Sequence, residues 1–260
     1  LAPKRLVVTV VILVLSLSYL QRFPAGDWQV ANCDIGQGDG AAINLGNHRA
    51  IVIDTGPDPE AIDRCLKQLG VREIPLLIIT HGHADHIAGW PGVTKGRKIG
   101  LTWYQNVKRG ARAQLQSTQG PVDIEVLWPD SGSYDPNNSS IAVRITTKDY
   151  TLFAGGDMEP LSQSLIASTM REVDIYKVCH HGSAYQDEIF TRALSPQVAM
   201  ISVGAGNSYG HPAPATLELL AQTGAKVLRT DRDGAIAISA RNHRLKVRTS
   251  RSKLTFLRWE

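Results

Sequence analysis

The sequence contains little cysteine, which limits the ways in which the fold can be stabilised. Three cysteines occur among 260 residues, and no two of them are close together in the chain. An odd, scattered set of this kind is neither the framework of a disulfide-rich fold nor the paired spacing of a zinc ribbon. We therefore expect Cys33, Cys65 and Cys179 each to be a small buried apolar residue.

Aromatic residues and excess charge are also scarce. Aromatics make up 6% of the chain, and the formal net charge is +4 at pH 7. A balance this mild favours contact with anions such as nucleic acid or lipid headgroups only weakly. The apolar share of 43% is typical of globular proteins, so we expect a folded chain of one large or two small domains.

The longest uncharged apolar run, at residues 6–20, is shorter than the roughly 20 residues that a membrane-spanning helix needs. It can be the end of a transmembrane helix, a signal peptide or a buried helix, and we favour the first. Basic residues before the run outnumber those just after it, which places the rest of the chain outside the cytoplasm. We expect a hydrophobic segment at 1–22 and a membrane-attached domain at 23–260 on the extracytoplasmic face.

Short apolar or alternating segments, interleaved with short helical patterns, fill the rest of the chain. Strands are expected at 28–35, 41–47, 50–56, 74–80, 122–129, 141–149, 150–157, 173–181 and 197–204, with a terminal hairpin at 235–240 and 245–250. Helices are expected at 61–69, 159–168, 187–194 and 213–223. This order predicts an α/β protein with a four-layer αββα sandwich, in which helices cover each sheet.

The segment Thr80–His86 is the strongest chemical signal in the sequence. It follows a buried apolar strand and holds His81, His83, Asp85 and His86 within six positions. Imidazole and carboxylate groups held together at a strand end suit Zn, Mn or Fe. We predict that His81 and His83 bind one ion and that Asp85 and His86 bind a second. The alternative is a solvated histidine-rich loop.

Further ligands are expected where other apolar strands end. Asp157, the pair His180 and His181, and His211 each follow such a strand. We predict Asp157 as a ligand that bridges both ions, His181 and His211 as further ligands, and His180 as a contact to the substrate. Asp157 can instead be a turn residue, His211 can be a surface histidine, and either of His180 and His181 can be the ligand.

A pair of divalent ions, Zn or Mn, would lower the pKa of a bridging water and clamp an oxygen of the substrate. No serine or cysteine nucleophile is then needed. We predict a metal-dependent hydrolase in which Asp85, Asp157 and His180 are catalytic.

These motifs resemble those of the metallo-β-lactamase superfamily. Asp54–Gly56 matches its first motif, residues 81–86 match its second, and Asp157 matches its bridging aspartate. The sequence departs from the pattern because no histidine between His86 and Asp157 has a convincing ligand context. In a subgroup with a His-His-Gly-Ser motif, a histidine after the aspartate fills that place, and His180–Ser183 fits this pattern.

The chain more closely resembles the C-terminal domain of the ComEC family of bacterial DNA-internalisation competence proteins. The shared motifs occur in family order: Asp34–Asp39, Ile53–Gly56, Thr80–Gly89, Asn137–Ser140, Gly155–Glu159, His180–Ser183, Asn207–Pro212 and Arg229–Asp231. The resemblance implies DNA uptake during transformation, in which this domain degrades the strand that is not transported. The implied partners are DNA, single-stranded in our prediction, and the membrane-channel portion of the same protein.

A DNA substrate needs side chains that hold its phosphate groups and the rest of the strand. We predict Asn137, Asn138, Ser139 and Ser183 as substrate-binding residues, because polar side chains can donate to phosphate oxygens; the Asn-rich loop can also be an ordinary turn. Basic residues gather at 95–112, among Trp90, Trp103 and Tyr104, and again at 241–258. Basic residues among aromatic ones suit the binding of single-stranded nucleic acid. Solvated loops or charged edge strands of the protein explain the two clusters equally well.

Two other functions remain open from the sequence. The protein can hydrolyse a small ester, thioester or lactam, or it can be a non-catalytic module that guides DNA. A long basic channel would favour DNA, and a closed apolar pocket would favour a small substrate.

Overall fold

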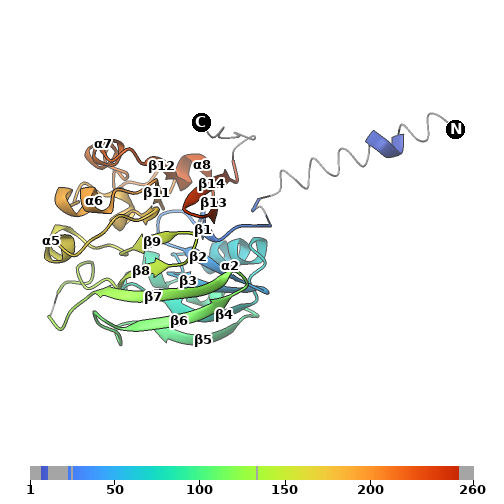
Figure 1. The fold of residues 1–260 in the computed structure, drawn as a ribbon, viewed down its shortest axis with the longest axis horizontal. Coiled ribbons are helices and arrows are strands. Elements are labelled where there is room, and N and C mark those ends of the chain that lie inside the picture. The colour runs from blue at the N-terminus through green and yellow to red at the C-terminus, as the bar shows by residue number, and fades with distance from the viewer. Residues whose placement is uncertain (1–6, 11–22, 25, 133, 252–260) are drawn as a thin grey trace.

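The structure, a computed structural model, describes residues 7–10, 23–24, 26–132 and 134–251. Within these residues, two seven-stranded sheets lie face to face, and helices cover the outer surface of each sheet. Figure 1 shows α5, α6 and α7 along one side of the molecule and α2 along the other. The predicted four-layer αββα sandwich is confirmed.

The first sheet has the strand order β14-β13-β1-β2-β3-β4-β5. Its strands are β1 (Val30–Asn32), β2 (Ala41–Gly46), β3 (Arg49–Ile53), β4 (Glu73–Ile78), β5 (Lys98–Trp103), β13 (Ile236–Arg241) and β14 (Arg244–Thr249). Strands β3, β4 and β5 are parallel, and the other neighbours are antiparallel. The helices that follow these strands are α2 (Pro59–Gln68), α3 (Ala84–Ile87) and α4 (Trp90–Thr94).

The second sheet has the order β12-β11-β10-β9-β8-β7-β6. Its strands are β6 (Arg112–Ser117), β7 (Gly120–Trp128), β8 (Ala142–Thr146), β9 (Thr151–Ala154), β10 (Ile175–Lys177), β11 (Val198–Ile201) and β12 (Lys226–Arg229). Strands β9 to β12 are parallel. The helices are α5 (Pro160–Ala167), the 3₁₀ turn η1 (Cys179–Gly182), α6 (Glu188–Leu194), α7 (Pro214–Gln222) and α8 (Thr230–Asp233).

Local sequence explains how the helices begin. The side chain of Asp58 caps α2 by accepting a hydrogen bond from the Glu60 amide, and Pro59 occupies the first turn, where its missing N–H costs nothing. Ile62 and Leu66, four residues apart, share one face of α2 and are fully buried against the first sheet. Burial of each such side chain contributes roughly 1.5–3 kcal/mol.

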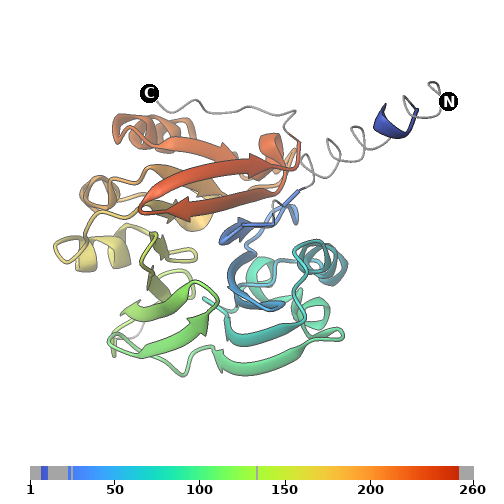
Figure 2. The same ribbon diagram turned by 45° about the vertical axis from the view of Figure 1, so that its right-hand side comes forward.

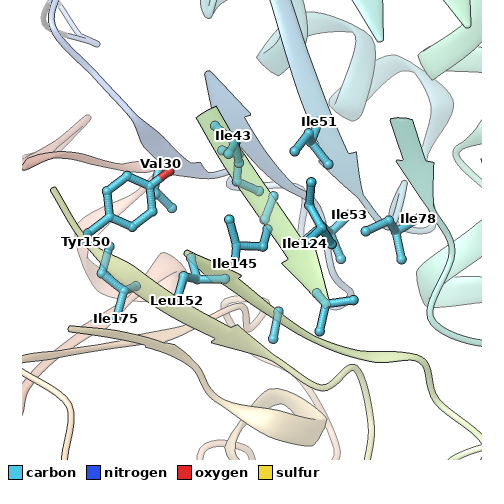
Figure 3. Packing of buried hydrophobic residues seen from close by; sticks show 14 of the residues in the cluster. Val30, Ile43, Ile51, Ile53, Ile78, Ile124, Ile145, Tyr150, Leu152 and Ile175 are labelled. Atoms are coloured by element: carbon cyan, nitrogen blue, oxygen red, sulfur yellow. The ribbon is translucent and has the colours of Figure 1, made fainter. Parts of the chain in front are cut away.

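The central core lies between the two sheets. Ile43, Ile51 and Ile53 of the first sheet meet Ile124 and Ile145 of the second, as Figure 3 shows. These residues alternate along their strands with residues that face the helices. Each sheet packs against the other sheet on one face and against helices on the other. This packing fixes the positions of the strand ends that lie beyond the core.

Several strands and helices differ from the expectation. Strands β1 and β10 are shorter than predicted, while β5, β6 and β12 had not been predicted as strands. Strands β5 and β6 are edge strands, and each carries one of the basic residues at 95–112, Lys98 on β5 and Arg112 on β6. The alternative of charged edge strands therefore describes part of this cluster. In Figure 2 the hairpin of β6 and β7, in green, forms one edge of the second sheet. The hairpin of β13 and β14, in orange-red, forms one edge of the first sheet.

The hydrophobic segment predicted at 1–22 lies outside the described residues, apart from residues 7–10, which are helical. Within the described part of the chain, no helix has the length and apolar character needed to span a membrane.

The expectation that all three cysteines are unpaired is wrong. Cys33, at the end of β1, and Cys65, on α2, form a disulfide with Cα atoms 5.9 Å apart. The separation of 32 residues hid the pairing in the sequence, because only the packing of α2 on the first sheet brings the two together. Cys179 is free and buried, as predicted.

We expect the Cys33–Cys65 disulfide to stabilise the fold by about 3–4 kcal/mol, because it closes a long loop in the unfolded chain. Urea denaturation with and without dithiothreitol measures this difference directly. The double variant Cys33→Ala/Cys65→Ala serves as the control, since dithiothreitol should not shift its midpoint. An unchanged wild-type midpoint in dithiothreitol would show that the bond contributes nothing.

Candidate metal centre

The predicted ligands converge at one end of the sandwich, where parallel strands of both sheets terminate. His81 lies three residues after β4, Asp157 three residues after β9, and His181 four residues after β10. Side chains at the carboxyl ends of neighbouring strands meet at a common edge. The packed core between the sheets therefore brings together Asp85 and His181, which are 96 positions apart in the chain.

Asp157 stands at the middle of this group, and its two carboxylate oxygens face different histidines. Oδ1 lies 3.1 Å from Nε2 of His86 and 3.6 Å from Nε2 of His181. Oδ2 lies 3.8 Å from Nε2 of both His81 and His180. One carboxylate thus divides the cluster into two halves.

Two sets of potential ligand atoms share this aspartate. Asp85, His86, His181 and Asp157 form one set, and His81, His83 and Asp157 form the other; within each set all ligand atoms lie within 4.8 Å of one another. The partition places His81 with His83 and Asp85 with His86, as the motif spacing indicated. His83 is exposed and Asp85 is partly exposed, so the centre opens to solvent.

Two buried histidines of the cluster, His86 and His181, are fixed through their Nδ1 atoms. Nδ1 of His86 lies 2.9 Å from Oδ2 of Asp54, and Nδ1 of His181 lies 3.1 Å from the carbonyl oxygen of Ser202. A histidine that donates its Nδ1–H in this way directs the lone pair of Nε2 to the opposite side. Nε2 of both rings therefore points toward Asp157.

The sequence interpretation did not include Asp54 and Ser140 among the site residues. Asp54 accepts hydrogen bonds from the amide and the hydroxyl of Thr80, in addition to His86. The Ser140 hydroxyl accepts from the Asp157 amide and lies 3.3 Å from Nδ1 of His81. Asp54 had been noted only as part of a motif, and its position at the end of a buried strand was the available signal.

A buried ion pair lies behind His181. Lys177, on β10, places its ammonium 2.5 Å from Oδ1 of Asp39, and both side chains are almost fully buried. The same oxygen of Asp39 lies 3.2 Å from Nδ1 of His181. Charges buried at this depth are tolerated when they neutralise each other, so Lys177 compensates part of the negative charge of the centre.

The surrounding charges determine the protonation of the cluster in the absence of a cation. Burial opposes the charged forms, but the carboxylates of Asp157 and Asp54 outweigh it and hold the pKa of His86 well above its usual value. The same competition, with Asp157 and Asp39, raises the pKa of His181 to about 9. Burial would raise the pKa of Asp157, but His86 and His181 hold it well below the usual range. Protons on the histidines thus supply the positive charge at this site.

The donor set fits a divalent cation. Nε2 of His81, Nε2 of His86 and Oδ1 of Asp157 are buried, and none of them makes a hydrogen bond of good geometry within the described residues, although the last two atoms lie 3.1 Å apart. Burial and the neighbouring His86 lower the pKa of His81 to about 3, so its ring is neutral at pH 7 and carries a lone pair. Unpartnered imidazole nitrogens beside a carboxylate are the ligands that Zn and similar ions take.

Three residues of this centre have a strained backbone. Asp54, His180 and His181 have φ values of 58°, 49° and 52°, in the left-handed region that non-glycine residues seldom adopt. Each such residue costs on the order of 1–3 kcal/mol and persists where the surrounding structure enforces it. The strain here orients the side chains of the cluster.

His180 and His211 lie beside the two ligand sets but outside them. Nδ1 of His180 is 3.2 Å from Oε1 of Glu159, and the ring centroids of His180 and His211 are 5.5 Å apart. The His211 ring stacks on His181 at 6.4 Å. Of the two adjacent histidines it is His181 that joins a ligand set.

The comparisons with known proteins agree with this geometry. The family model described as the metallo-beta-lactamase superfamily matches residues 36–204, more than half of the chain. The chain belongs to the metallo-β-lactamase superfamily.

Three relatives confirm the resemblance to competence proteins within this superfamily. The chain is 28% identical over 279 residues to ComE operon protein 3 of Bacillus subtilis and 29% identical over 226 residues to competence protein ComA of Neisseria gonorrhoeae. It is 24% identical over 262 residues to recombination protein 2 of Haemophilus influenzae. These alignments cover 88%, 82% and 95% of this chain but 35%, 32% and 33% of the relatives, so the chain spans about a third of their length.

Solved structures support the fold alone. A metallo hydrolase from Ignicoccus hospitalis, Igni18, aligns with a TM-score of 0.51 at 17% identity, over 77% of this chain and 94% of that protein. CmlA beta-hydroxylase, as its E377D mutant, aligns with a TM-score of 0.50 at 12% identity, over 79% and 53%.

The predicted substrate loop of this metallo-β-lactamase domain is largely engaged in internal contacts. The buried Asn138 side chain donates to Asp135 and accepts from Ser162, and the Ser139 hydroxyl donates to the Tyr134 carbonyl. Asn137 donates to Glu159, which places it nearer His180. This pattern favours the alternative of a turn for Asn138 and Ser139.

Ser183 is also engaged in local contacts. It is buried, and its hydroxyl accepts a hydrogen bond from the Tyr185 amide, so it closes the loop after His181. Its substrate contact stays a prediction.

Two side chains of the first basic cluster, at 95–112, form ion pairs within the domain. Arg97 is buried in an ion pair with Asp63, and Arg112 pairs with Glu125. Trp103, expected beside the basic residues as a stacking partner, is buried in the core between the sheets. This part of the surface therefore offers fewer contacts to a nucleic acid than its composition suggested.

The described part of the second basic cluster, residues 241–251, begins at the end of β13, follows β14 and ends just after it. Arg241, Arg244 and Lys246 line a hollow of about 600 Å³ near the tip of this hairpin. The other end of β13 pairs with Asn32, which contacts Ser202 beside His181. The tip is therefore at the end of β13 remote from the metal centre.

In protein stripped of metal with EDTA, we expect stability to fall as pH rises from about 6.5 to 9. The folded pKa of His181 is raised above its usual 6.5, so its protonated form stabilises the fold fully below pH 6.5, and this contribution is lost as pH rises through about 9. The loss should be on the order of 2–3 kcal/mol. Urea denaturation across this range measures it. His181→Gln should reduce this dependence, leaving the part that comes from His86, whose pKa is also raised. A flat wild-type profile would contradict the charge pairing.

Lys177→Met should destabilise the fold by about 3–5 kcal/mol, because it leaves Asp39 buried beside other carboxylates without its cation. Adding Asp39→Asn should recover part of this loss, since the two groups interact directly. Denaturation midpoints of the wild type, both single variants and the double variant complete the cycle. Additive effects of the two substitutions would refute the pairing.

Proposed function

We propose that this protein is a two-metal phosphodiesterase that cuts DNA during bacterial DNA uptake and degrades the strand that is not transported. The observation that carries the proposal is the Asp157 carboxylate, whose two oxygens face two separate sets of histidine and aspartate ligands. The similarity to competence proteins supplies the biological setting.

In this proposal Zn or Mn ions occupy both sets. His81, His83 and Asp157 hold one ion, and Asp85, His86, His181 and Asp157 hold the other. His211 stays a proposed ligand. It lies outside both sets and its ring stacks on His181, but its Nδ1 is buried and has no hydrogen-bond partner among the described residues.

When bound, such ions lower the pKa of an attacking water and polarise the phosphate. The remaining chemistry comes from the chain itself. Asp85 is partly exposed, and burial, which would raise its pKa, is outweighed by His181 and His86, which lower it. It is therefore an ionised carboxylate at pH 7, able to orient a water proton.

We infer that His180 interacts with the leaving group of the substrate. It is partly exposed, borders Oδ2 of Asp157, and is close to Glu159, so it can donate a hydrogen bond to a substrate oxygen beside the metal centre. Asn137, bonded to the same Glu159, is the member of the substrate loop that borders this position.

The open character of the centre favours a polymer over a small substrate. His83 is exposed, and Asp85 and His180 are partly exposed. A small ester or lactam is ordinarily enclosed in a pocket that buries most of its surface. A phosphodiester within a long chain needs only local access to the metal centre.

The disulfide supports an extracytoplasmic location. Cys33–Cys65 would be reduced in most bacterial cytoplasms, whereas disulfides persist in the periplasm and at cell surfaces. We propose that the domain faces outward and is attached to the membrane-channel portion of the same protein.

The purified chain, loaded with Mn or Zn, should hydrolyse labelled single-stranded DNA, and EDTA should stop the reaction. His83→Ala and Asp157→Asn should each lower the rate at least about a hundredfold, because each removes a metal ligand while the fold is retained. Gel assays of cleavage, with metal content measured on the same samples, check this result.

His48→Ala is the matched control, since it removes another exposed histidine outside the centre and should leave cleavage unchanged. Hydrolysis of a phosphorylcholine ester, a thioester or a lactam with DNA left intact would refute the DNA proposal and leave the assignment as a hydrolase. Binding of DNA without any hydrolysis would instead identify a guiding module.

A further inference from the structure

Tyr209 lies on a loop between β11 and α7 that is held in one shape by a single side chain. The side-chain Nδ2 of Asn207 donates to the carbonyl oxygens of Gly204 and His211. Its Oδ1 accepts from the backbone amides of Tyr209 and His211. Such internal bonding fixes the backbone under Tyr209. The tyrosine is therefore presented from a rigid base.

The Tyr209 side chain is nevertheless 70% exposed. Its ring stacks on His211, with centroids 5.8 Å apart and planes inclined by 29°. His211 in turn stacks on His181, which belongs to a ligand set. A column of rings thus leads from the proposed metal centre to solvent, and Tyr209 is its outermost member.

This position suits a nucleobase. His211 stacks against one side of the Tyr209 ring, and most of the tyrosine surface remains exposed to solvent. Aromatic side chains beside a strand-binding site stack on bases of any sequence, because every base has an aromatic face. Bases within a duplex are already stacked on each other and cannot make this contact.

We propose that Tyr209 is a stacking platform for one nucleobase, next to the phosphate that lies at the metal centre, and that it selects single-stranded over duplex DNA. The inference rests on the proposed function, because the base is carried by the same substrate. Tyr209 acts on binding and strand preference, and the reacting phosphate does not touch it.

The competing role for Tyr209 is structural, since stacking also restrains His211. The two roles predict different losses. A stacking platform affects only substrates that carry bases, whereas a restraint on His211 would alter metal affinity and every substrate equally.

The test compares binding of two ten-residue oligomers, one of thymidine and one of abasic residues, to Mn-loaded protein. Both carry phosphorothioate linkages to slow hydrolysis, and fluorescence anisotropy gives the affinities. Wild type should prefer the base-bearing oligomer by about fivefold to a hundredfold. Tyr209→Ala should remove this preference, and Tyr209→Phe should retain it because the ring remains.

Leu101→Ala is the matched control: Leu101 is another strongly exposed apolar side chain, but it lies on edge strand β5. Thermal denaturation and Mn titration of each variant show whether fold and metal binding persist. Equal affinity of wild type for both oligomers, or a preference that survives Tyr209→Ala, would overturn the proposal. So would a Tyr209→Ala variant that loses Mn affinity and binds both oligomers equally weakly. Base-dependent binding without cleavage would refute the nuclease proposal alone.

Discussion

The Asp157 carboxylate between two groups of histidines is the interaction on which this site depends. A buried carboxylate is costly unless positive charge or hydrogen bonds compensate it. Here His86 and His181 compensate one oxygen, and His81 and His180 lie near the other. Protons supply the positive charge in metal-free protein, and divalent ions would supply it in the proposed active form. The same arrangement therefore links stability, pH and metal binding.

The scaffold around Asp157 shows how such a cluster is maintained. Asp54, Ser202 and Ser140 hold the outer nitrogens of three histidines, and Lys177 with Asp39 supports His181 from behind. The Asp39 amide donates to the carbonyl of Asp85, so its loop lies directly against the second motif. Gly38 permits this approach, because a Cβ atom there would collide with the Asp85 carbonyl oxygen. Residues outside the two ligand sets thus decide where the ligand atoms point.

Function in this fold comes from what surrounds the metal centre. The superfamily accounts for the candidate ligands, whereas our proposal of a polymeric substrate rests on the open access at His83 and Asp85 and on the exposed ring of Tyr209. The basic clusters contribute less than composition suggested, since Arg97 and Arg112 are engaged in ion pairs within the domain. In the proposed function, electrostatic attraction of DNA would come from the remaining basic side chains.

The amino-acid sequence by itself determined the sandwich and the first ligands. Apolar periodicity is local, so most strands and helices followed from it, although the edge strands β5, β6 and β12 did not. The candidate ligands of residues 81–86 are near each other in any conformation of that segment. Tertiary structure alone decided the rest. The Cys33–Cys65 bond, the Lys177–Asp39 pair and the inclusion of His181 over its neighbour His180 depend on packing between segments distant in the chain. Long-range contacts of this kind leave no spacing in the sequence, because the sheets and helices that create them pack together only after folding.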